Sequence, residues 1–297
     1  MCIKKSTLFL FSAILIASSL SFSCKKDETS GIPAYVKINE VKVVTDLKRE
    51  GSASSNIADV WFFANGDDLG IFELPCEIPV LRSGNTTLSL FGGIKQSGLS
   101  GLRAAYPFYE TYKMDTDLVE ENTVTISPVL KYKDGTNFPW REGFDDLSFS
   151  LDTAPESKVG LVRVTHPDSV KEGKASVGAY MTTENPYFLA SSSETYVLPN
   201  TGEDVYLEFD YQTNTKIQVH VRSYNTSGQS VLIPIVLVNS KEDDSGKPIW
   251  NKMYVFLSPY LPRQANAFQY QIYFESGINT AANSQGYLLL DNIKLVY

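Results

Sequence analysis

The strongest constraint on the fold is the alternation of apolar and polar residues within short segments that end in turns. Residues 35–45 (YVKINEVKVVT) alternate with period two, which is typical of a strand with one buried face. From Trp140 onward comparable segments return about every 8 to 12 residues, a spacing typical of β-sandwiches and jelly rolls. No amphipathic helix longer than two turns is apparent. The sequence therefore predicts an all-β chain.

A polar stretch at 134–139 divides the chain into two predicted parts. It carries Gly135 and Pro139, which favour a linker over a strand, and an aromatic cluster follows it. We therefore expect a small N-terminal β-sandwich at 34–133 and a C-terminal jelly-roll β-sandwich at 140–297.

The first part contains a hairpin signal, because Asn65-Gly66 lies between the apolar runs 58–63 and 69–74. Another strand is expected at 86–91 and a glycine-rich loop at 92–102. In the second part we expect strands at 147–151, 159–164, 175–181, 205–211, 216–224, 231–238, 253–257, 268–274 and 287–297.

The N-terminus carries an export signal. Lys4 and Lys5 precede an apolar run at 8–22, which has the length of a signal-peptide core and is too short for a membrane span. Ser23 then places a small residue before Cys24. This arrangement resembles a bacterial lipoprotein signal, and its loose form resembles those of Bacteroidota.

That resemblance implies that residues 1–23 are removed, that Cys24 is lipidated and that 24–33 forms a tether. The charged tract after the cysteine (KKDE) is similar to the tracts that direct Bacteroidota lipoproteins to the outer face of the outer membrane. We therefore expect a lipid-anchored outer-membrane protein that faces the cell exterior. The alternatives are an ordinary signal peptide with a coincidental cysteine, and a charged tract that is only a solvated tether.

Charge and cysteine content exclude several functions. Loss of Lys4 and Lys5 with the leader would change the formal net charge from −8 to −10, so a nucleic acid is not an expected partner. Lipidation of Cys24 would leave Cys76 as the one free thiol of the mature chain, without a disulfide partner, and we expect it to be buried and inert. Two histidines are too few for a histidine-built zinc site.

No catalytic cluster is apparent. The carboxylate pairs Asp67-Asp68 and Asp243-Asp244 lie in predicted turns, where solvated turn residues are the simpler interpretation. Nucleophile-elbow, phosphate-loop and zinc-protease motifs are missing. We therefore expect a non-catalytic protein.

Residues 60–90 resemble PEGA-like surface β-domains. The resemblance is carried by Val60-Trp61-Phe62, Gly66, Gly70-Ile71-Phe72 and Pro79-Val80-Leu81, and it covers about thirty residues. The insertion at 92–112 departs from that pattern.

The second part resembles the galactose-binding-like jelly rolls of many carbohydrate-binding modules. The strand at 207–211 (LEFDY) and the terminal strand at 290–295 (LDNIKL) carry this resemblance, which spans residues 140–297. In that family, an early acidic residue and the aspartate of the last strand often share a structural calcium. The matching positions are Glu142, Asp145 or Asp146, and Asp291. The alternative role is a carboxylate that accepts backbone hydrogen bonds at a strand end.

Aromatic residues are abundant, with 17 Tyr, 16 Phe and 3 Trp, and sugar-binding proteins commonly use exposed aromatic platforms. Trp250, Tyr254 and Tyr187 are the candidate ligand-binding residues. The alternative is that they fill the core or a protein interface. Asp152-Thr153-Ala154 resembles the Bacteroidota O-glycosylation motif, with Thr153 as the acceptor.

These features give two hypotheses about function. The first is a non-catalytic accessory subunit of an outer-membrane complex for β-barrel assembly, secretion or uptake, with a barrel or other lipoproteins as partners. The alternative is a glycan-binding lipoprotein of a polysaccharide-uptake system. A broad apolar patch with a polar rim would favour the first hypothesis, and exposed coplanar aromatics on one face of the jelly roll the second.

Overall fold

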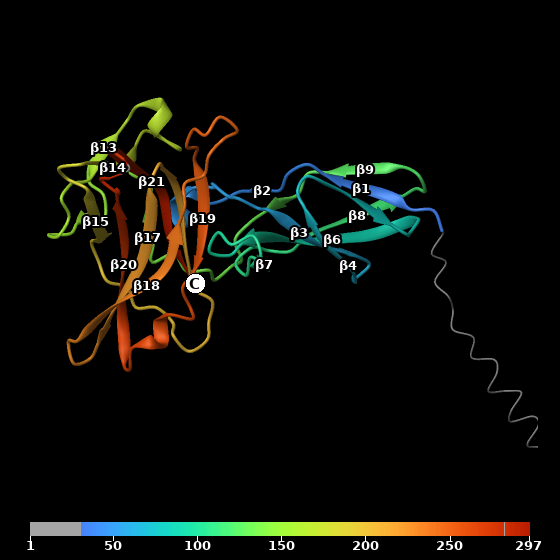
Figure 1. The fold of residues 1–297 in the computed structure, drawn as a ribbon. Coiled ribbons are helices and arrows are strands. Elements are labelled where there is room, and N and C mark those ends of the chain that lie inside the picture. The colour runs from blue at the N-terminus through green and yellow to red at the C-terminus, as the bar shows by residue number, and fades with distance from the viewer. Residues whose placement is uncertain (1–30, 282) are drawn as a thin grey trace, which may run out of the picture.

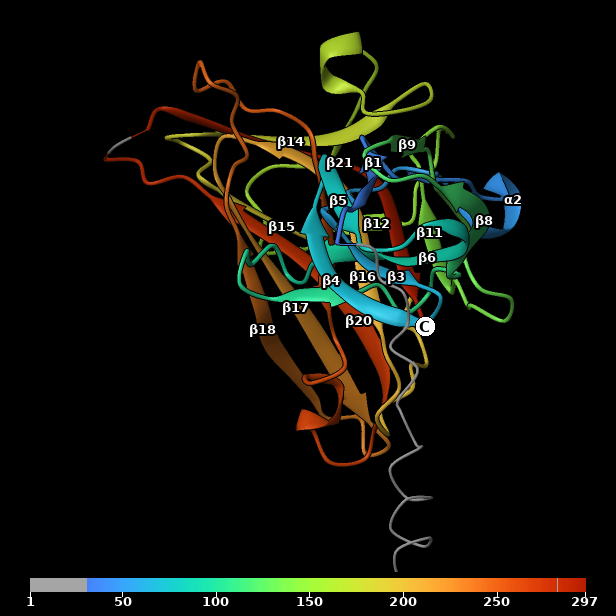
Figure 2. The ribbon, with the colours of Figure 1, turned by 90° about the vertical axis from the view of Figure 1, so that its right-hand side faces the viewer.

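Two β-units lie end to end in this protein (Figure 1). The computed structural model describes residues 31–281 and 283–297 and is all-β apart from short helical turns. Strand β1 begins at the end of the N-terminal unit that is remote from the second unit (Figure 1). Figure 2 views the molecule along this long axis, with the N-terminal strands nearest the viewer.

The predicted leader, Cys24 and the start of the tether lie outside the described residues, so lipidation remains a prediction. Within the described part of the chain, no helix is long and apolar enough to cross a membrane.

The N-terminal unit is a small β-sandwich. Its elements are β1 (Ala34–Ile38), β2 (Lys42–Val43), α2 (Leu47–Glu50), β3 (Asp59–Ala64), β4 (Asp67–Glu73), β5 (Cys76–Val80), β6 (Gly84–Lys95), β7 (Arg103–Ala105), β8 (Tyr112–Leu118), β9 (Thr123–Ile126) and β10 (Val129–Leu130). One sheet has the order β4-β3-β6-β7, and β8 also pairs with β6. A second sheet has the order β5-β1-β9, and β2 pairs with β10.

The C-terminal unit is a jelly roll of two sheets. Its elements are β11 (Trp140–Glu142), β12 (Leu151–Thr153), β13 (Val162–Val164), η1 (Pro167–Ser169), β14 (Ser176–Thr182), β15 (Tyr187–Ser192), β16 (Tyr206–Thr213), β17 (Lys216–Asn225), β18 (Ser230–Val238), β19 (Asn251–Phe256), η2 (Leu261–Arg263), β20 (Ala267–Gly277) and β21 (Gln285–Val296). We call the sheet ordered β13-β14-β21-β16-β19, with β11 beside β21, the β21 sheet. We call the sheet ordered β12-β15-β20-β17-β18 the β20 sheet.

The jelly-roll core lies between these two sheets. Leu207 and Phe209 of β16 meet Ile272 and Phe274 of β20, and all four are fully buried. The rings of Phe209 and Phe274 pack edge to face with centroids 5.2 Å apart. Burial of such side chains from both sheets is the main favourable term in folding this unit.

Strand β16 is buried on both faces. One face packs in the jelly-roll core and the other packs against the N-terminal unit, so the two units form consecutive layers. Because side chains alternate along a strand, Leu207 and Phe209 enter the jelly-roll core while Tyr206, Glu208 and Asp210 point the other way. Tyr206 belongs to the hydrophobic cluster of the N-terminal unit. The order of layers is therefore the N-terminal unit, the β21 sheet, the core and the β20 sheet, with the far side of the β20 sheet pointing away from the N-terminal unit.

Several strand predictions are confirmed and others need correction. The hairpin of β3 and β4 turns at Asn65 and Gly66, both with positive φ, as predicted. Residues 35–45 do not form one strand, since β1 ends at Ile38 and β2 pairs separately. Strands β8, β11 and β15 were not expected. Every residue of β15 after Tyr187 is buried, so its sequence lacks the alternation that predicts a half-buried strand.

The glycine-rich loop expected at 92–102 was also wrong, because β6 continues through Gly92 and Gly93 to Lys95. A Cβ at Gly93 would lie 1.7 Å from Oδ1 of Asp59, and one at Gly92 would lie 2.6 Å from Leu130. These glycines permit close approach of neighbouring side chains to the strand and do not mark a turn.

Candidate functional site: the outer face of the β20 sheet

The side chains of the β20 sheet that point away from the core form the candidate site, which we call the outer face. Strand register places Glu275 opposite Leu189 and Gln218, and Tyr273 opposite His220. Residues that are directly opposite one another share a face of the sheet. The outer face includes Asp152, Tyr187, Leu189, Ser191, Lys216, Gln218, His220, Arg222, Tyr224, Gln271, Tyr273 and Glu275.

The centre of this face is recessed. Tyr273 is 7% exposed and His220 is 8% exposed, although both side chains point away from the jelly-roll core. Tyr273 and Leu189 form a small apolar cluster of their own, against which Tyr187 packs. The outer face therefore combines an apolar, tyrosine-bearing floor with polar groups around it.

Gln271 is the centre of a hydrogen-bond network on this face. Its Oε1 accepts hydrogen bonds from the hydroxyls of Tyr224 at 2.7 Å and Tyr273 at 3.0 Å. Its Nε2 donates to the backbone carbonyl of Ser192 at 2.7 Å and to Oγ of Ser191 at 3.2 Å. The amide thus fixes both tyrosine rings. Burial raises the pKa of Tyr224, and Tyr273 beside it adds to this shift.

His220 and Glu275 form a second polar pair, with 2.5 Å between Nε2 and the carboxylate. The other ring nitrogen of His220, Nδ1, is buried and has no hydrogen-bond partner. Burial, with Glu275 as a second cause, raises the pKa of Tyr187 to about 12, so this hydroxyl stays protonated at neutral pH.

Arg222 lies over the ring of Tyr273, with Cζ 4.8 Å from the ring centroid. Its Nε is buried and, like Nδ1 of His220, lacks a hydrogen-bond partner. Buried polar atoms without partners are uncommon in native proteins and cost about 1–3 kcal/mol each. Both atoms lie on β17, two residues apart, and thus on the same face of the sheet. A ligand with hydroxyl or carboxylate oxygens could satisfy both.

The residues predicted from the sequence are not brought together. Tyr187 lies on the outer face, at the β15 side. Tyr254 is 1% exposed and lies on the opposite side of the jelly roll, between the two units, where its hydroxyl accepts a hydrogen bond from the backbone of Asn56. It therefore cannot stack on a sugar ring. Trp250 is half-buried next to β19, and its Nε1 is buried without a partner.

The predicted calcium ligands are occupied by hydrogen bonds within the protein. Glu142 accepts from the backbone amides of Phe144 and Ser150, and Asp291 accepts from the hydroxyl of Ser176. Asp145 accepts from the amide of Lys174 at 2.5 Å. Within residues 31–281 and 283–297, no group of three His, Cys, Asp or Glu residues is placed to hold a metal. The hydrogen bonds of these carboxylates match the alternative role, and a shared calcium stays a prediction.

Two remaining predictions concern Thr153 and Cys76. Thr153 is exposed on β12, where its Oγ1 accepts a hydrogen bond from the amide of Leu161, and O-glycosylation there stays a prediction. Cys76 is half-buried, not fully buried, and burial raises the pKa of its thiol, which disfavours the reactive thiolate.

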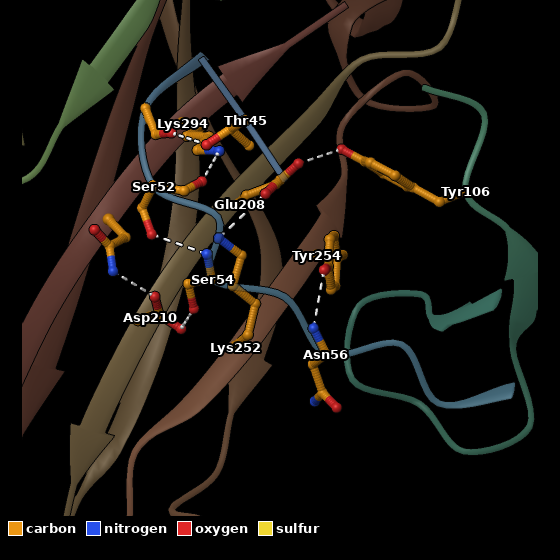
Figure 3. Close-up of polar contacts among 12 residues, drawn as sticks. Thr45, Ser52, Ser54, Asn56, Tyr106, Glu208, Asp210, Lys252, Tyr254 and Lys294 are labelled. Carbon is orange, nitrogen blue, oxygen red and sulfur yellow. Dashed lines mark hydrogen bonds and ion pairs between the residues drawn. The ribbon is translucent and has the colours of Figure 1, made fainter. Parts of the chain in front are cut away.

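A network of buried charges joins the two units (Figure 3). The carboxylate of Glu208 accepts hydrogen bonds from Tyr106 at 2.6 Å and Tyr132 at 2.8 Å, and Nζ of Lys252 lies 3.1 Å from its other oxygen. The contact with Lys252 is an ion pair without hydrogen-bond geometry. Lys294 donates to the hydroxyl of Tyr132 at 3.4 Å. The network thus links β16, β19 and β21 to the N-terminal unit.

The charged groups in this network shift one another's pKa values. Burial alone raises the pKa of Glu208, but Lys252 and Lys294 and the two hydroxyls hold it below its usual value. Burial lowers the pKa of Lys294 to about 8. Next to this network, Glu142, Asp145, Glu172 and Lys294 are among the residues that line a cleft of about 550 Å³. Arg141, Glu142 and Asp145 of this cleft bond to backbone atoms, and Glu172 accepts from Ser52 and Asn292, so we assign the cleft and the network a structural role.

The sequence analysis did not identify most residues of the outer face, although one strand carries a pattern that could have indicated them. Residues 217–224 (IQVHVRSY) alternate, and their outward positions carry Gln, His, Arg and Tyr in place of the Lys, Glu and Thr common on solvent-facing strands. Side chains of that kind, repeated on one face, combine aromatic surface with amide and cationic donors.

The chain matches no protein-family model and no curated protein. Solved structures that resemble it include carbohydrate-binding β-sandwich modules. The CBM22-1 xylan-binding domain from Paenibacillus barcinonensis Xyn10C is 14% identical, covers 55% of this chain and 96% of its own, and has a TM-score of 0.38. A CBM61 module in complex with β-1,4-galactotriose is 12% identical, with coverages of 52% and 93% and a TM-score of 0.33. A CBM28 module specific for non-crystalline cellulose is 14% identical, with coverages of 49% and 86% and a TM-score of 0.34. Because these TM-scores are below 0.5, the likeness carries no argument about the ligand of this chain.

Proposed function

We propose that this protein binds a glycan on the outer face of the β20 sheet. One observation carries the proposal. The recessed centre of an outward-pointing sheet face holds tyrosines and amides together with two buried polar atoms, Nδ1 of His220 and Nε of Arg222, that lack partners. A sugar ring offers an apolar face for the tyrosines and hydroxyl groups that both donate and accept hydrogen bonds.

The layer order suits a surface protein that is anchored at its N-terminus. Strand β1 begins at one end of the molecule, and the outer face lies on the far side of the jelly roll (Figure 1). We propose that Cys24 is lipidated, that the protein is held on the exterior of the outer membrane and that its N-terminal unit, which resembles PEGA-like domains, acts as a spacer. The outer face would then point away from the membrane.

The test is a glycan array probed with the mature chain carrying Cys24→Ser, so that no lipid is attached. Positive glycans are then titrated against two variants. Gln271→Ala removes the amide that holds Tyr224 and Tyr273, and we expect it to weaken binding at least about tenfold. Tyr180→Ala removes a 47% exposed tyrosine from β14 in the other sheet and should leave the affinity unchanged. Equal effects of the two variants would place binding elsewhere.

One observation favours the second candidate function, an accessory subunit of an outer-membrane complex. Strand β18 is an edge strand and exposes Val231 at 46%, Leu232 at 38% and Leu237 at 49%. Such an edge can pair with another protein. Stoichiometric recovery of a single barrel protein with the C-terminally tagged lipoprotein from mild detergent would support this function, and recovery of the lipoprotein alone would argue against it.

A further inference from the structure

Arg222 is a half-buried cation whose charge is not balanced by a carboxylate. The described residues provide no ion pair for it. Arg103, whose side chain is 25% exposed, differs because it pairs with both Asp59 and Glu73. The chain has 34 acidic and 26 basic residues, yet no carboxylate of the described residues pairs with this arginine. A guanidinium removed from water without a counter-charge is unfavourable.

The contact with Tyr273 does not use the hydrogen-bonding capacity of Arg222. Cζ of Arg222 lies over the ring of Tyr273, 4.8 Å from its centroid, and this cation–π contact supplies no oxygen acceptor to the N–H donors of the guanidinium. One of these donors, Nε, is buried and without a partner. The guanidinium also lies within hydrogen-bond reach of the Tyr224 hydroxyl, so Nε is the donor that still lacks an acceptor.

Glu275, the carboxylate of the outer face that lies on β20, is already engaged. Glu275 lies 2.5 Å from Nε2 of His220, so it is paired with the histidine and not with Arg222. Opposite Arg222 across the sheet lie Gln271 on β20 and Leu232 on β18, and both are uncharged. Lys216, at the start of β17, adds positive charge on the same face and is exposed. Arg222 and Lys216 thus place two positive charges on the outer face, beside Glu275 and the exposed Asp152 at the β12 edge.

We infer that the ligand of the outer face is an acidic glycan whose oxyanion, a uronate carboxylate or a sulfate ester, pairs with Arg222. This inference rests on the proposed glycan-binding function and names the class of glycan. Guanidinium groups bind planar carboxylates through two parallel N–H donors, and stacking on a tyrosine pre-organises that fork. Partial exclusion of water in the recess strengthens the pairing relative to bulk solvent.

The test measures binding of matched acidic and neutral glycans to the mature Cys24→Ser chain by calorimetry at low salt. The pairs are galacturonan and its methyl ester, glucuronoxylan and unsubstituted xylan, and carrageenan and its desulfated form. We expect at least one acidic member to bind about tenfold or more tightly than its neutral partner, a difference that added salt reduces. A preference for the uronates identifies a carboxylate, and a preference for carrageenan identifies a sulfate.

Two arginine variants decide whether Arg222 causes this preference. Arg222→Gln should bind the acidic and neutral members of each pair with equal affinity. Arg263→Gln is the matched control, since Arg263 lies over Tyr260 with Cζ 4.3 Å from the ring centroid but is exposed at the end of η2, and it should keep the preference. Circular dichroism checks that both variants fold.

The outcomes separate the two proposals. If neutral glycans bind as tightly as acidic ones and Gln271→Ala weakens both, the inference about charge is overturned while the proposed function stands. If no glycan binds, or binding is indifferent to Gln271→Ala, the proposed function fails and the inference fails with it.

Discussion

Glu208 of β16 and Lys252 of β19 form an ion pair at 3.1 Å in which the side chains are 0% and 2% exposed. The pair lies where the jelly roll meets the N-terminal unit, and Tyr106 reaches Glu208 from that unit (Figure 3). Tyr132 of the same unit also donates a hydrogen bond to Glu208. Charges buried in this way are satisfied only while both units stay together. We call this contact between the two units, centred on Glu208 and Lys252, the seam. It holds the two units in a fixed order, so the outer face lies at the end of the molecule opposite β1.

Removal of Glu208 should strongly destabilise the protein. Glu208→Ala leaves Lys252 buried without its carboxylate, and loss of one member of a buried pair costs about 3–5 kcal/mol. Urea unfolding followed by tryptophan fluorescence measures the change. The control is Glu40→Ala, because Glu40 and Lys42 form an exposed pair with side chains 66% and 65% exposed, and this change should stay within about 0.5 kcal/mol. Similar losses in both variants would contradict the structural role of the seam.

Lys294 should make stability depend on pH in the mildly alkaline range. Its pKa is lowered from 10.5 to about 8 by burial, so between these values the unfolded chain binds more protons than the folded one. Stability due to this group therefore rises as pH increases from about 8 toward 10. Lys294→Met cannot lose a proton and should lack that rise.

The measurement compares urea midpoints of the wild type and Lys294→Met at pH 7.5 to 9.5, below the range in which tyrosines titrate. Cys76 also titrates near this range, but it is common to both proteins and cancels in the difference. A stability difference that stays constant across these pH values would show that Lys294 is not the titrating group.

Gly93→Ala should destabilise the N-terminal unit. The added Cβ would lie 1.7 Å from Oδ1 of Asp59, whose other oxygen binds Arg103 at 2.7 Å. Relief of this clash requires movement of a buried ion pair, and we expect a loss of about 2–3 kcal/mol. Gly160→Ala is the control because a Cβ there meets nothing within 4 Å. An unchanged thermal midpoint in Gly93→Ala would refute the close packing of β6 against β3.

Removal of divalent metal should leave the protein unaffected. The carboxylates of Glu142 and Asp291 accept hydrogen bonds from within the chain, so we expect EDTA to leave the thermal midpoint unchanged. Glu142→Gln should lower the midpoint with or without calcium, because a side-chain amide has one acceptor oxygen in place of two. A fall of several degrees in EDTA that calcium reverses would restore the calcium site predicted from family resemblance.

The sequence was sufficient for the all-β class and for much of the strand pattern, because alternation reports burial of one strand face directly. It could not identify the candidate site. The outer face depends on β17 lying beside β20, and about forty residues of chain separate the end of one strand from the start of the other. Strand β15, which supplies Tyr187 and Leu189, is buried along most of its length and gave no alternating signal.

Tyr254 is a residue that the sequence wrongly suggested as an exposed ligand-binding side chain. Its strand was predicted near 253–257, but the side chain is 1% exposed because the N-terminal unit covers that face of β19. Only contact between segments that are distant in sequence distinguishes an exposed aromatic platform from a covered one.

The central claim is that the outer face of the β20 sheet binds a glycan. It is tested most directly by NMR titration of the deuterated mature Cys24→Ser chain with a glycan selected on the array. The side-chain amide signal of Gln271 is assigned by comparison with Gln271→Ala, and that of Gln218 with Gln218→Ala. We predict that both amide signals shift in proportion to saturation, while those of Asn279 and Asn283 at the loop end of the jelly roll do not. Saturable binding that leaves Gln218 and Gln271 unmoved would contradict the claim.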